Sequence, residues 1–147
     1  MRGRFSAGLY PVTTNVIFGE MSDASPDGRH RGEPLADGMS KVPNIVAIKE
    51  ASGNIEQVSE IKALCGDKLD VYSGEDGIIT PILSVGGIGV ISVLSHLVPR
   101  ETHEICAKYF AGDVKGSAAL QLKYLDLVKA LFSDVSPIPV KAAINLM

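Results

Sequence analysis

The sequence is poor in cysteine and has no excess of positive charge. Its two cysteines, Cys65 and Cys106, are too few for a scaffold held by disulfides, and they favour a reducing compartment. Fourteen lysines and arginines against 17 aspartates and glutamates give a net charge of -3. A nucleic-acid or anionic-membrane surface usually needs a basic excess. These shortages argue against an extracellular disulfide protein and against a nucleic-acid partner.

Long apolar runs are also missing. No stretch approaches the roughly 18 apolar residues of a membrane-spanning helix, and the N-terminus lacks the apolar core of a signal peptide. His103 and Cys106 lie three residues apart, but the chain has no CxxC or HxxxH pattern that would indicate a zinc site. We therefore expect a soluble, cytoplasmic protein that has no membrane partner and no bound metal.

The composition is that of a globular protein, but it changes near residue 40. Hydrophobic residues make up 46% of the 147-residue chain, which has the length of a single domain. All nine lysines lie at or after Lys41, and four of the five arginines lie at or before Arg31. Glycine, proline, aspartate and serine dominate residues 19–38 without a helical or strand period. We expect a loop-like or disordered segment over residues 1–40 and a folded part over residues 41–147.

The folded part alternates short apolar runs with helical patterns. Strands are expected at residues 44–48, 69–73 and 89–93, the first of them buried on both faces. Helices are expected at residues 55–65, 78–85, 99–110 and 115–132, and after Pro139 through Met147. Strands that alternate with helices at this spacing indicate βα units and a parallel sheet, here followed by a helical cap.

Local signals set several boundaries within this pattern. Asn54 is expected to cap the first of these helices, and Gly66 to end it. Residues 74–77 (GEDG) predict a turn. Glu75 and Asp76 lie in that turn, and we expect them to be solvated rather than to form a catalytic acid pair.

Lys49 is the strongest candidate for chemistry. It lies at the carboxyl end of the first expected strand, where parallel α/β folds place their active sites, and residues 46–48 before it are apolar. In apolar surroundings an ammonium group loses solvation, which lowers the pKa of a lysine and frees its amine to attack a carbonyl. From position alone, a lysine that extends from the strand end into water is the commoner alternative.

Four motifs, in the expected order, resemble those of the dihydrodipicolinate synthase family. They are the Schiff-base lysine motif at Val46–Asn54 (VAIKEASGN), the SG(D/N/E)D turn at Ser73–Asp76 (SGED), the GGxGVISV strand at Gly86–Val93 (GGIGVISV) and the near-terminal PIPVK segment at Pro137–Lys141. N-acetylneuraminate lyases share the lysine and the barrel but resemble the last two motifs less. The resemblance covers residues 41–147.

The resemblance implies an α/β fold: a partial (β/α)8 TIM barrel, made of the last three βα units, with a C-terminal helical extension. It implies that Lys49 is catalytic and forms an imine with pyruvate, that the backbone of Ile91 contacts the bound pyruvate, and that Gly74 lies close to the same pocket. The resulting enamine would add to aspartate semialdehyde in lysine (diaminopimelate) biosynthesis. The imine is itself the electron sink, so no metal or organic cofactor is expected. Family members commonly form homotetramers.

Part of the family pattern has no counterpart in this chain. The threonine pair that binds the pyruvate carboxylate and the proton-relay tyrosine belong to the unmatched part of the family. Thr13, Thr14 and Tyr10 lack the surrounding GTTGE and LYNVPxRTG motifs, so no role is expected for them. Three strands cannot close an eight-stranded barrel, which predicts a fragment prone to association. Two alternatives therefore stay open. One is an inert barrel fragment that associates with itself or with a full-length relative, and the other is a different pyruvate-dependent class I aldolase, such as an N-acetylneuraminate lyase relative.

Overall fold

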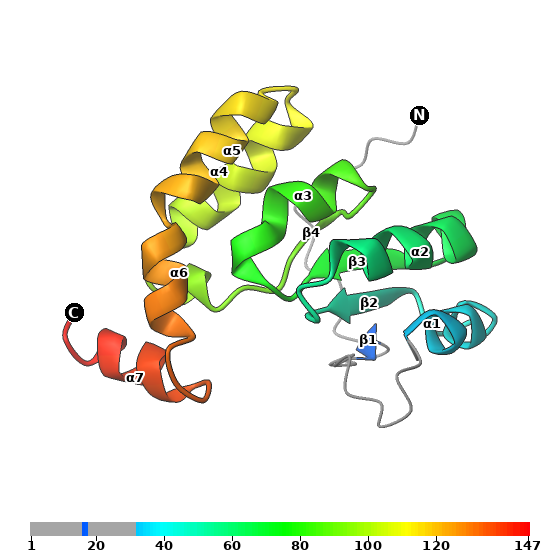
Figure 1. Cartoon of the computed structure of the whole chain (residues 1–147), viewed down its shortest axis with the longest axis horizontal. Coiled ribbons are helices and arrows are strands. Elements are labelled where there is room, and N and C mark those ends of the chain that lie inside the picture. The colour runs from blue at the N-terminus through cyan, green and yellow to red at the C-terminus, as the bar shows by residue number, and fades with distance from the viewer. Residues whose placement is uncertain (1–15, 18–31) are drawn as a thin grey trace.

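A parallel four-stranded sheet forms the centre of the chain. The computed structural model describes residues 16–17 and 32–147, with side chains from residue 36 onward. The strands lie in the order β1-β2-β3-β4 (Figure 1). Their bounds are β1 (Val16–Ile17), β2 (Ala47–Glu50), β3 (Asp70–Ser73) and β4 (Gly89–Val90). Sequential strands are spatial neighbours, as expected for consecutive βα units.

Helices precede, connect and follow these strands. The first three are α1 (Gly32–Ser40), α2 (Ile55–Cys65) and α3 (Ile79–Ser84). Four more come after β4: α4 (Pro99–Phe110), α5 (Val114–Lys123), α6 (Leu125–Leu131) and α7 (Ile138–Ile144). Short 3-10 helices lie at η1 (Gly66–Lys68), η2 (Asp76–Ile78) and η3 (Leu94–His96). Across the described ranges, no helix has both the length and the apolar character needed to cross a membrane.

One face of the sheet packs against helices, and the other is more open. The main core joins α1, α2 and α3 to β2 and β3; its buried members are Ala36, Met39, Ile48, Val58, Ile61, Cys65, Leu69, Val71 and Ile82. Ile48 and Val71 are paired in register, and both are fully buried in this core. Side chains alternate along a strand, so the next pair, Lys49 and Tyr72, projects to the opposite face, where both are only partly buried.

The C-terminal helices pack on the sheet unit through two smaller cores. Ile79 and Leu83 of α3 pack with Ile105 of α4, and Leu94 of η3 packs with residues of α6 and α7. In Figure 1, α1 and α2 lie at one end of the molecule and α6 and α7 at the other.

A buried polar cluster reinforces the attachment of α5. The side chain of Gln121 accepts a hydrogen bond from the Thr80 amide (2.7 Å) and donates one to the Gly77 carbonyl (2.6 Å). The Ser117 hydroxyl donates to the Ile105 carbonyl (2.7 Å). The helical extension is therefore fixed to α3 and α4 by hydrogen bonds as well as by apolar contacts.

The expected architecture is confirmed: three βα strands of a partial barrel, followed by a helical extension. The first strand is buried on both faces at Ala47 (4% exposed) and Ile48 (0% exposed), as expected, but it is shorter than expected. This strand begins at Ala47 rather than at residue 44, and Val46 is 57% exposed. The third strand is also shorter than expected, since β4 covers only Gly89–Val90.

The segment before residue 41 contains more regular structure than its composition predicts. The strand β1 pairs in parallel with β2, and α1 occupies residues 32–40, so a loop throughout residues 19–38 is wrong for its last part. Ala36 and Met39 of α1 are buried in the main core. Tertiary burial of this kind overrides weak local propensity. The division into two parts at residue 40 stays a prediction.

The long helix expected over residues 115–132 is interrupted. At Tyr124 the backbone amide bonds to the Gln121 carbonyl, three residues back, instead of continuing the four-residue pattern. This tighter turn separates α5, which packs on α3 and α4, from α6, which packs against η3. The change of direction lets each helix bury its own apolar side.

Local capping signals at α2 are confirmed. The side-chain oxygen of Asn54 accepts hydrogen bonds from the amides of Glu56 (3.0 Å) and Gln57 (3.3 Å). Gly66 ends the helix at a φ of 56°, in a region that side chains disfavour. This fixes where α2 begins and ends after the loop that follows Lys49.

Replacing the cap tests how much it stabilises the fold. Asn54→Ala removes the acceptor for two helix amides and should lower the free energy of unfolding by about 1 kcal/mol, measured by urea denaturation. Asn54→Ser keeps a capping oxygen and should stay within a few tenths of a kcal/mol of the parent. Equal stability of the Ala variant and the parent would contradict the capping role.

Candidate functional site

The three candidate residues lie at the carboxyl ends of adjacent parallel strands. Lys49 is the third residue of β2, Gly74 directly follows β3, and Ile91 directly follows β4. The Gly74 amide donates to the Glu50 carbonyl (2.6 Å), and the Ile91 amide donates to the Ser73 carbonyl (2.8 Å). These bonds extend the parallel ladders beyond the strands, so the three residues share one edge of the sheet.

Lys49 and Gly74 are in direct contact. A Cβ atom added at Gly74 would lie 2.7 Å from Cε and 2.9 Å from Cγ of Lys49, and 2.6 Å from Cβ of Ala51. These distances are too short for real carbon atoms, so the lysine chain occupies space that any other residue at position 74 would fill. The missing side chain of Gly74 therefore leaves a slot that the lysine chain fills.

Tyr72 is the strand neighbour of Lys49. It is paired in register with Lys49 on one side and with Gly89 on the other. A Cβ at Gly89 would lie 3.2 Å from the Tyr72 ring, so the ring packs against the bare backbone of β4. Burial, and to a lesser extent the nearby Asp70 carboxylate, raise the pKa of the Tyr72 phenol above its usual range. The group beside Lys49 is thus a neutral phenol at neutral pH.

Glu50 is a buried carboxylate that sequence reasoning missed. It is fully buried, and one of its oxygens accepts from the Ser52 amide (3.0 Å) and from the Gln57 side chain (3.3 Å). These bonds fasten the loop after Lys49 to the start of α2. The signal in the sequence was a charged residue that continues an apolar strand, which is unusual unless the charge has partners.

Asp76 also differs from expectation, because the predicted solvated turn is wrong for this residue. Asp76 is 1% exposed, and its Oδ2 atom accepts hydrogen bonds from the amides of Val93 (2.9 Å) and Leu94 (2.8 Å). Its neighbour Glu75 remains partly exposed and caps η2 through the Gly77 amide. Asp76 therefore connects the chain after β3 with the chain after β4.

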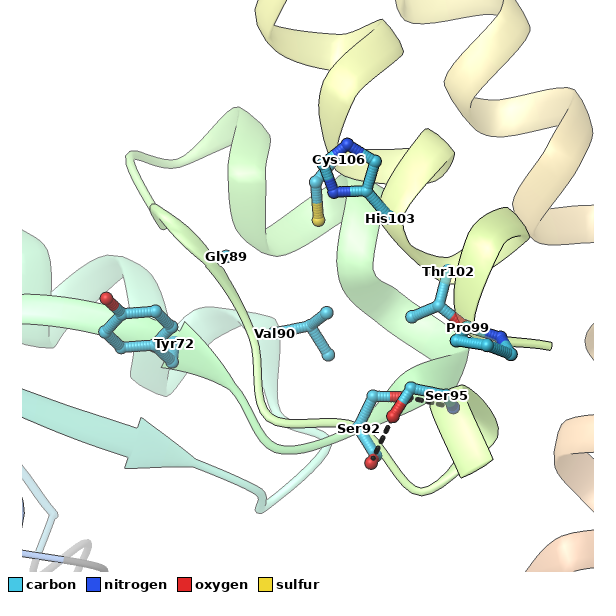
Figure 2. Close-up of a pocket in the computed structure, with 9 residues that line it drawn as sticks. All are labelled: Tyr72, Gly89, Val90, Ser92, Ser95, Pro99, Thr102, His103 and Cys106. Carbon is cyan, nitrogen blue, oxygen red and sulfur yellow. Dashed lines mark hydrogen bonds between the residues drawn. The ribbon is translucent and has the colours of Figure 1, made fainter. Parts of the chain in front are cut away.

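A separate pocket of about 300 Å³ lies between β4 and α4 (Figure 2). It is lined by Tyr72, Gly89, Val90, Ser92, Ser95, Pro99, Thr102, His103 and Cys106. Figure 2 shows Tyr72 on one side of it and His103 with Cys106 on the other. Lys49, Gly74 and Ile91 do not line this pocket, which adjoins their site through Tyr72.

The cysteine in this pocket is not activated. Burial raises the pKa of the Cys106 thiol, which keeps it protonated and weakly nucleophilic at neutral pH. Within residues 36–147, no group of three or more histidine, cysteine, aspartate or glutamate side chains could hold a metal ion. Tyr10, Thr13 and Thr14 lie outside the described residues.

Sequence comparison finds close relatives for most of the chain. Residues 36–147 match the model of the dihydrodipicolinate synthetase family. The 4-hydroxy-tetrahydrodipicolinate synthase of Lachnoclostridium phytofermentans is 59% identical over 109 residues, and that of Caldicellulosiruptor saccharolyticus is 60% identical over 109 residues. Each alignment covers 74% of this chain and 37% of the relative, so the chain spans less than two fifths of these proteins.

Solved structures give the same result. The dihydrodipicolinate synthase of Thermotoga maritima superposes with a TM-score of 0.78 at 36% identity, covering 89% of this chain and 45% of that one. A monomeric dihydrodipicolinate synthase variant gives a TM-score of 0.79 at 35% identity. The chain belongs to the dihydrodipicolinate synthetase family.

Proposed function

We propose that this chain is the lysine-bearing part of a 4-hydroxy-tetrahydrodipicolinate synthase and that Lys49 forms a Schiff base with pyruvate. The observation that carries the proposal is the fit of the lysine chain into the slot at Gly74, at the carboxyl edge of a parallel sheet. Packing at Gly74 restricts the rotamers of the Lys49 side chain. The amine therefore loses less conformational entropy when it reacts. Relatives that carry the synthase name support the same chemistry.

The proposed reaction begins with attack of the Lys49 amine on the keto carbon of pyruvate. Loss of water gives an imine, which accepts electron density when a proton leaves the pyruvate methyl group. The enamine then adds to the aldehyde carbon of aspartate semialdehyde, and cyclisation follows. The Ile91 backbone contacts the bound pyruvate, Gly74 keeps the lysine chain in place, and the reaction uses no metal or organic cofactor.

The two stages of this reaction make different demands on the protein. Imine formation needs the amine and space for a small 2-oxo acid, and the amine lies at the edge formed by β2, β3 and β4. The aldol step also needs groups that orient the aldehyde and relay protons. The chain spans only part of its relatives, so we assign imine formation to this chain and assign the second stage to the complete enzyme.

The choice of aldehyde separates the synthase from other pyruvate-dependent aldolases. Several curated relatives between 52% and 60% identical carry the synthase name, which favours aspartate semialdehyde over the substrate of an N-acetylneuraminate lyase. A panel of aldehydes offered to the complete enzyme would show which one consumes the enamine.

A second candidate is a fragment that only associates with another chain. The observation in its favour is that β1 and β4 are the edge strands of the described sheet, and the face that carries Lys49 is only partly covered. Under this proposal the partner is a second copy of the chain or a full-length relative, and a homotetramer belongs to the complete enzyme. The two cysteines, Cys65 and Cys106, are both free, which supports a cytoplasmic location.

Reductive trapping tests the role of Lys49. With pyruvate and borohydride, the parent chain should gain the mass of one reduced pyruvate adduct, and peptide mapping should place the adduct at Lys49. Lys49→Arg should abolish the adduct, because a guanidinium forms no imine under these conditions. Lys129→Arg, which changes an exposed lysine of α6, should retain it. An unlabelled parent chain would favour the associating fragment.

Gly74→Ala tests the slot. The new methyl group would displace the Lys49 chain, and the trapping rate should fall by about tenfold or more, since small misplacements of a reacting group are costly. Gly38→Ala is the matched control: a Cβ at this helical position meets no atom within 4 Å, so the rate should not change. Equal trapping rates for Gly74→Ala and the parent would exclude the slot.

Light scattering coupled to size-exclusion chromatography tests association. The parent chain should elute with a mass above that of one chain, and the mass should increase with concentration, because unpaired strand edges recruit partners. Leu122→Lys changes an exposed leucine of α5, outside the sheet, and should leave the mass unchanged. A constant monomer mass would contradict association, and loss of association in Leu122→Lys would move the interface to α5.

A further inference from the structure

The segment that follows β4 is short and is held from several sides. Ile91 is joined to β3 by its amide, which donates to the Ser73 carbonyl (2.8 Å). Three residues later η3 begins. The Ser95 amide donates to the Ser92 hydroxyl (2.9 Å), and the Ser95 hydroxyl donates to the Ser92 carbonyl (3.0 Å), which closes this turn locally (Figure 2).

Asp76 holds the same segment by further hydrogen bonds. Its Oδ2 atom takes hydrogen bonds from two successive amides, those of Val93 and Leu94, which open η3. Bonds between a carboxylate and backbone amides are shorter and stronger than bonds between neutral groups. Because Asp76 lies two residues after Gly74, one side chain connects the lysine slot with the strand end at Ile91.

Stability alone is a poor explanation for this carboxylate. Asp76 is 1% exposed, and its second oxygen, Oδ1, is buried without a hydrogen-bond partner among the described residues. A buried carboxylate with an unsatisfied oxygen carries a desolvation cost, and apolar replacements of buried charges are often no less stable. The carboxylate instead orients the backbone, since one of its oxygens accepts hydrogen bonds from two amides at once.

We propose that Asp76 is a positioning residue for pyruvate: it fixes the turn after β4 and thereby holds the Ile91 backbone at the distance from Lys49 that the bound substrate requires. This rests on the proposed function of Lys49 and Ile91. Asp76 itself does not touch the substrate. Its role is to keep two strand ends in a constant relation while the amine reacts.

The test uses Asp76→Ala, Asp76→Asn and the control Ser117→Ala. Ser117 is fully buried and donates to the Ile105 carbonyl, so its loss removes a buried hydrogen bond outside the segment that follows β4. Two quantities are measured for each chain: the hydrogen exchange of the Val93 and Leu94 amides, and the pyruvate concentration that gives half-maximal trapping at Lys49.

Asp76→Ala should speed exchange of both amides and raise the half-maximal pyruvate concentration by about tenfold, the loss expected for hydrogen bonds to a charged group. Its plateau trapping rate should change much less, since the Lys49 amine is untouched. Asp76→Asn keeps an acceptor oxygen and should fall between the Ala variant and the parent. Ser117→Ala should change neither quantity.

Two results would overturn the proposal. One is faster exchange in a folded Asp76 variant with an unchanged half-maximal pyruvate concentration, which would leave Asp76 with a structural role only. The other is a shift in the pyruvate concentration that Ser117→Ala reproduces. If the proposed function itself fails, the parent chain takes up no label at Lys49 while the exchange difference persists, and Asp76 then has no role toward pyruvate.

Discussion

The parallel pairing of β2, β3 and β4 is the constraint on which the rest of the site depends. The register places Lys49 beside Tyr72 and Tyr72 beside Gly89, and it sends Ile48 and Val71 into the helical core instead. A shift by one residue would exchange these two sets and bury the lysine under α2. Burial of the apolar residues on one face therefore fixes which side chains lie on the opposite face.

Parallel strands end at a common edge, and the chain must turn at each end without leaving buried backbone groups unpaired. Here two buried carboxylates meet that need. Glu50 binds the amide of the loop after β2, and Asp76 binds the two amides that open η3 after β4. Both carry an oxygen without a partner among the described residues. At both strand ends a buried carboxylate thus orders a loop near Lys49, and the unpaired oxygen carries a desolvation penalty.

The sequence predicts the features that depend on neighbours along the chain. The cap at Asn54, the end of α2 at Gly66 and the position of Lys49 at a strand end all follow from patterns of a few residues. Features that depend on distant contacts were missed. The helix α1 lies in a stretch rich in glycine, proline and aspartate and is stabilised by burial of Ala36 and Met39. Asp76 is buried, and it accepts hydrogen bonds from amides 17 and 18 residues away. The roles of Lys49, Gly74 and Ile91 toward pyruvate remain proposals.

The open face of the sheet explains why the two stages of the proposed chemistry can be separated. The Lys49 chain occupies the space that a side chain at Gly74 would fill, within the sheet itself, so its placement does not require a closed barrel. Exclusion of water and orientation of an aldehyde require walls on the side that Lys49 faces, where the side chains of Lys49 and Tyr72 are only partly covered. Because an imine is hydrolysed when water reaches it, an open site can form the adduct reversibly while failing to commit it to carbon–carbon bond formation. Under the proposed function, the part of the barrel around Lys49 therefore determines which group reacts, and closure of the barrel determines whether carbon–carbon bond formation follows.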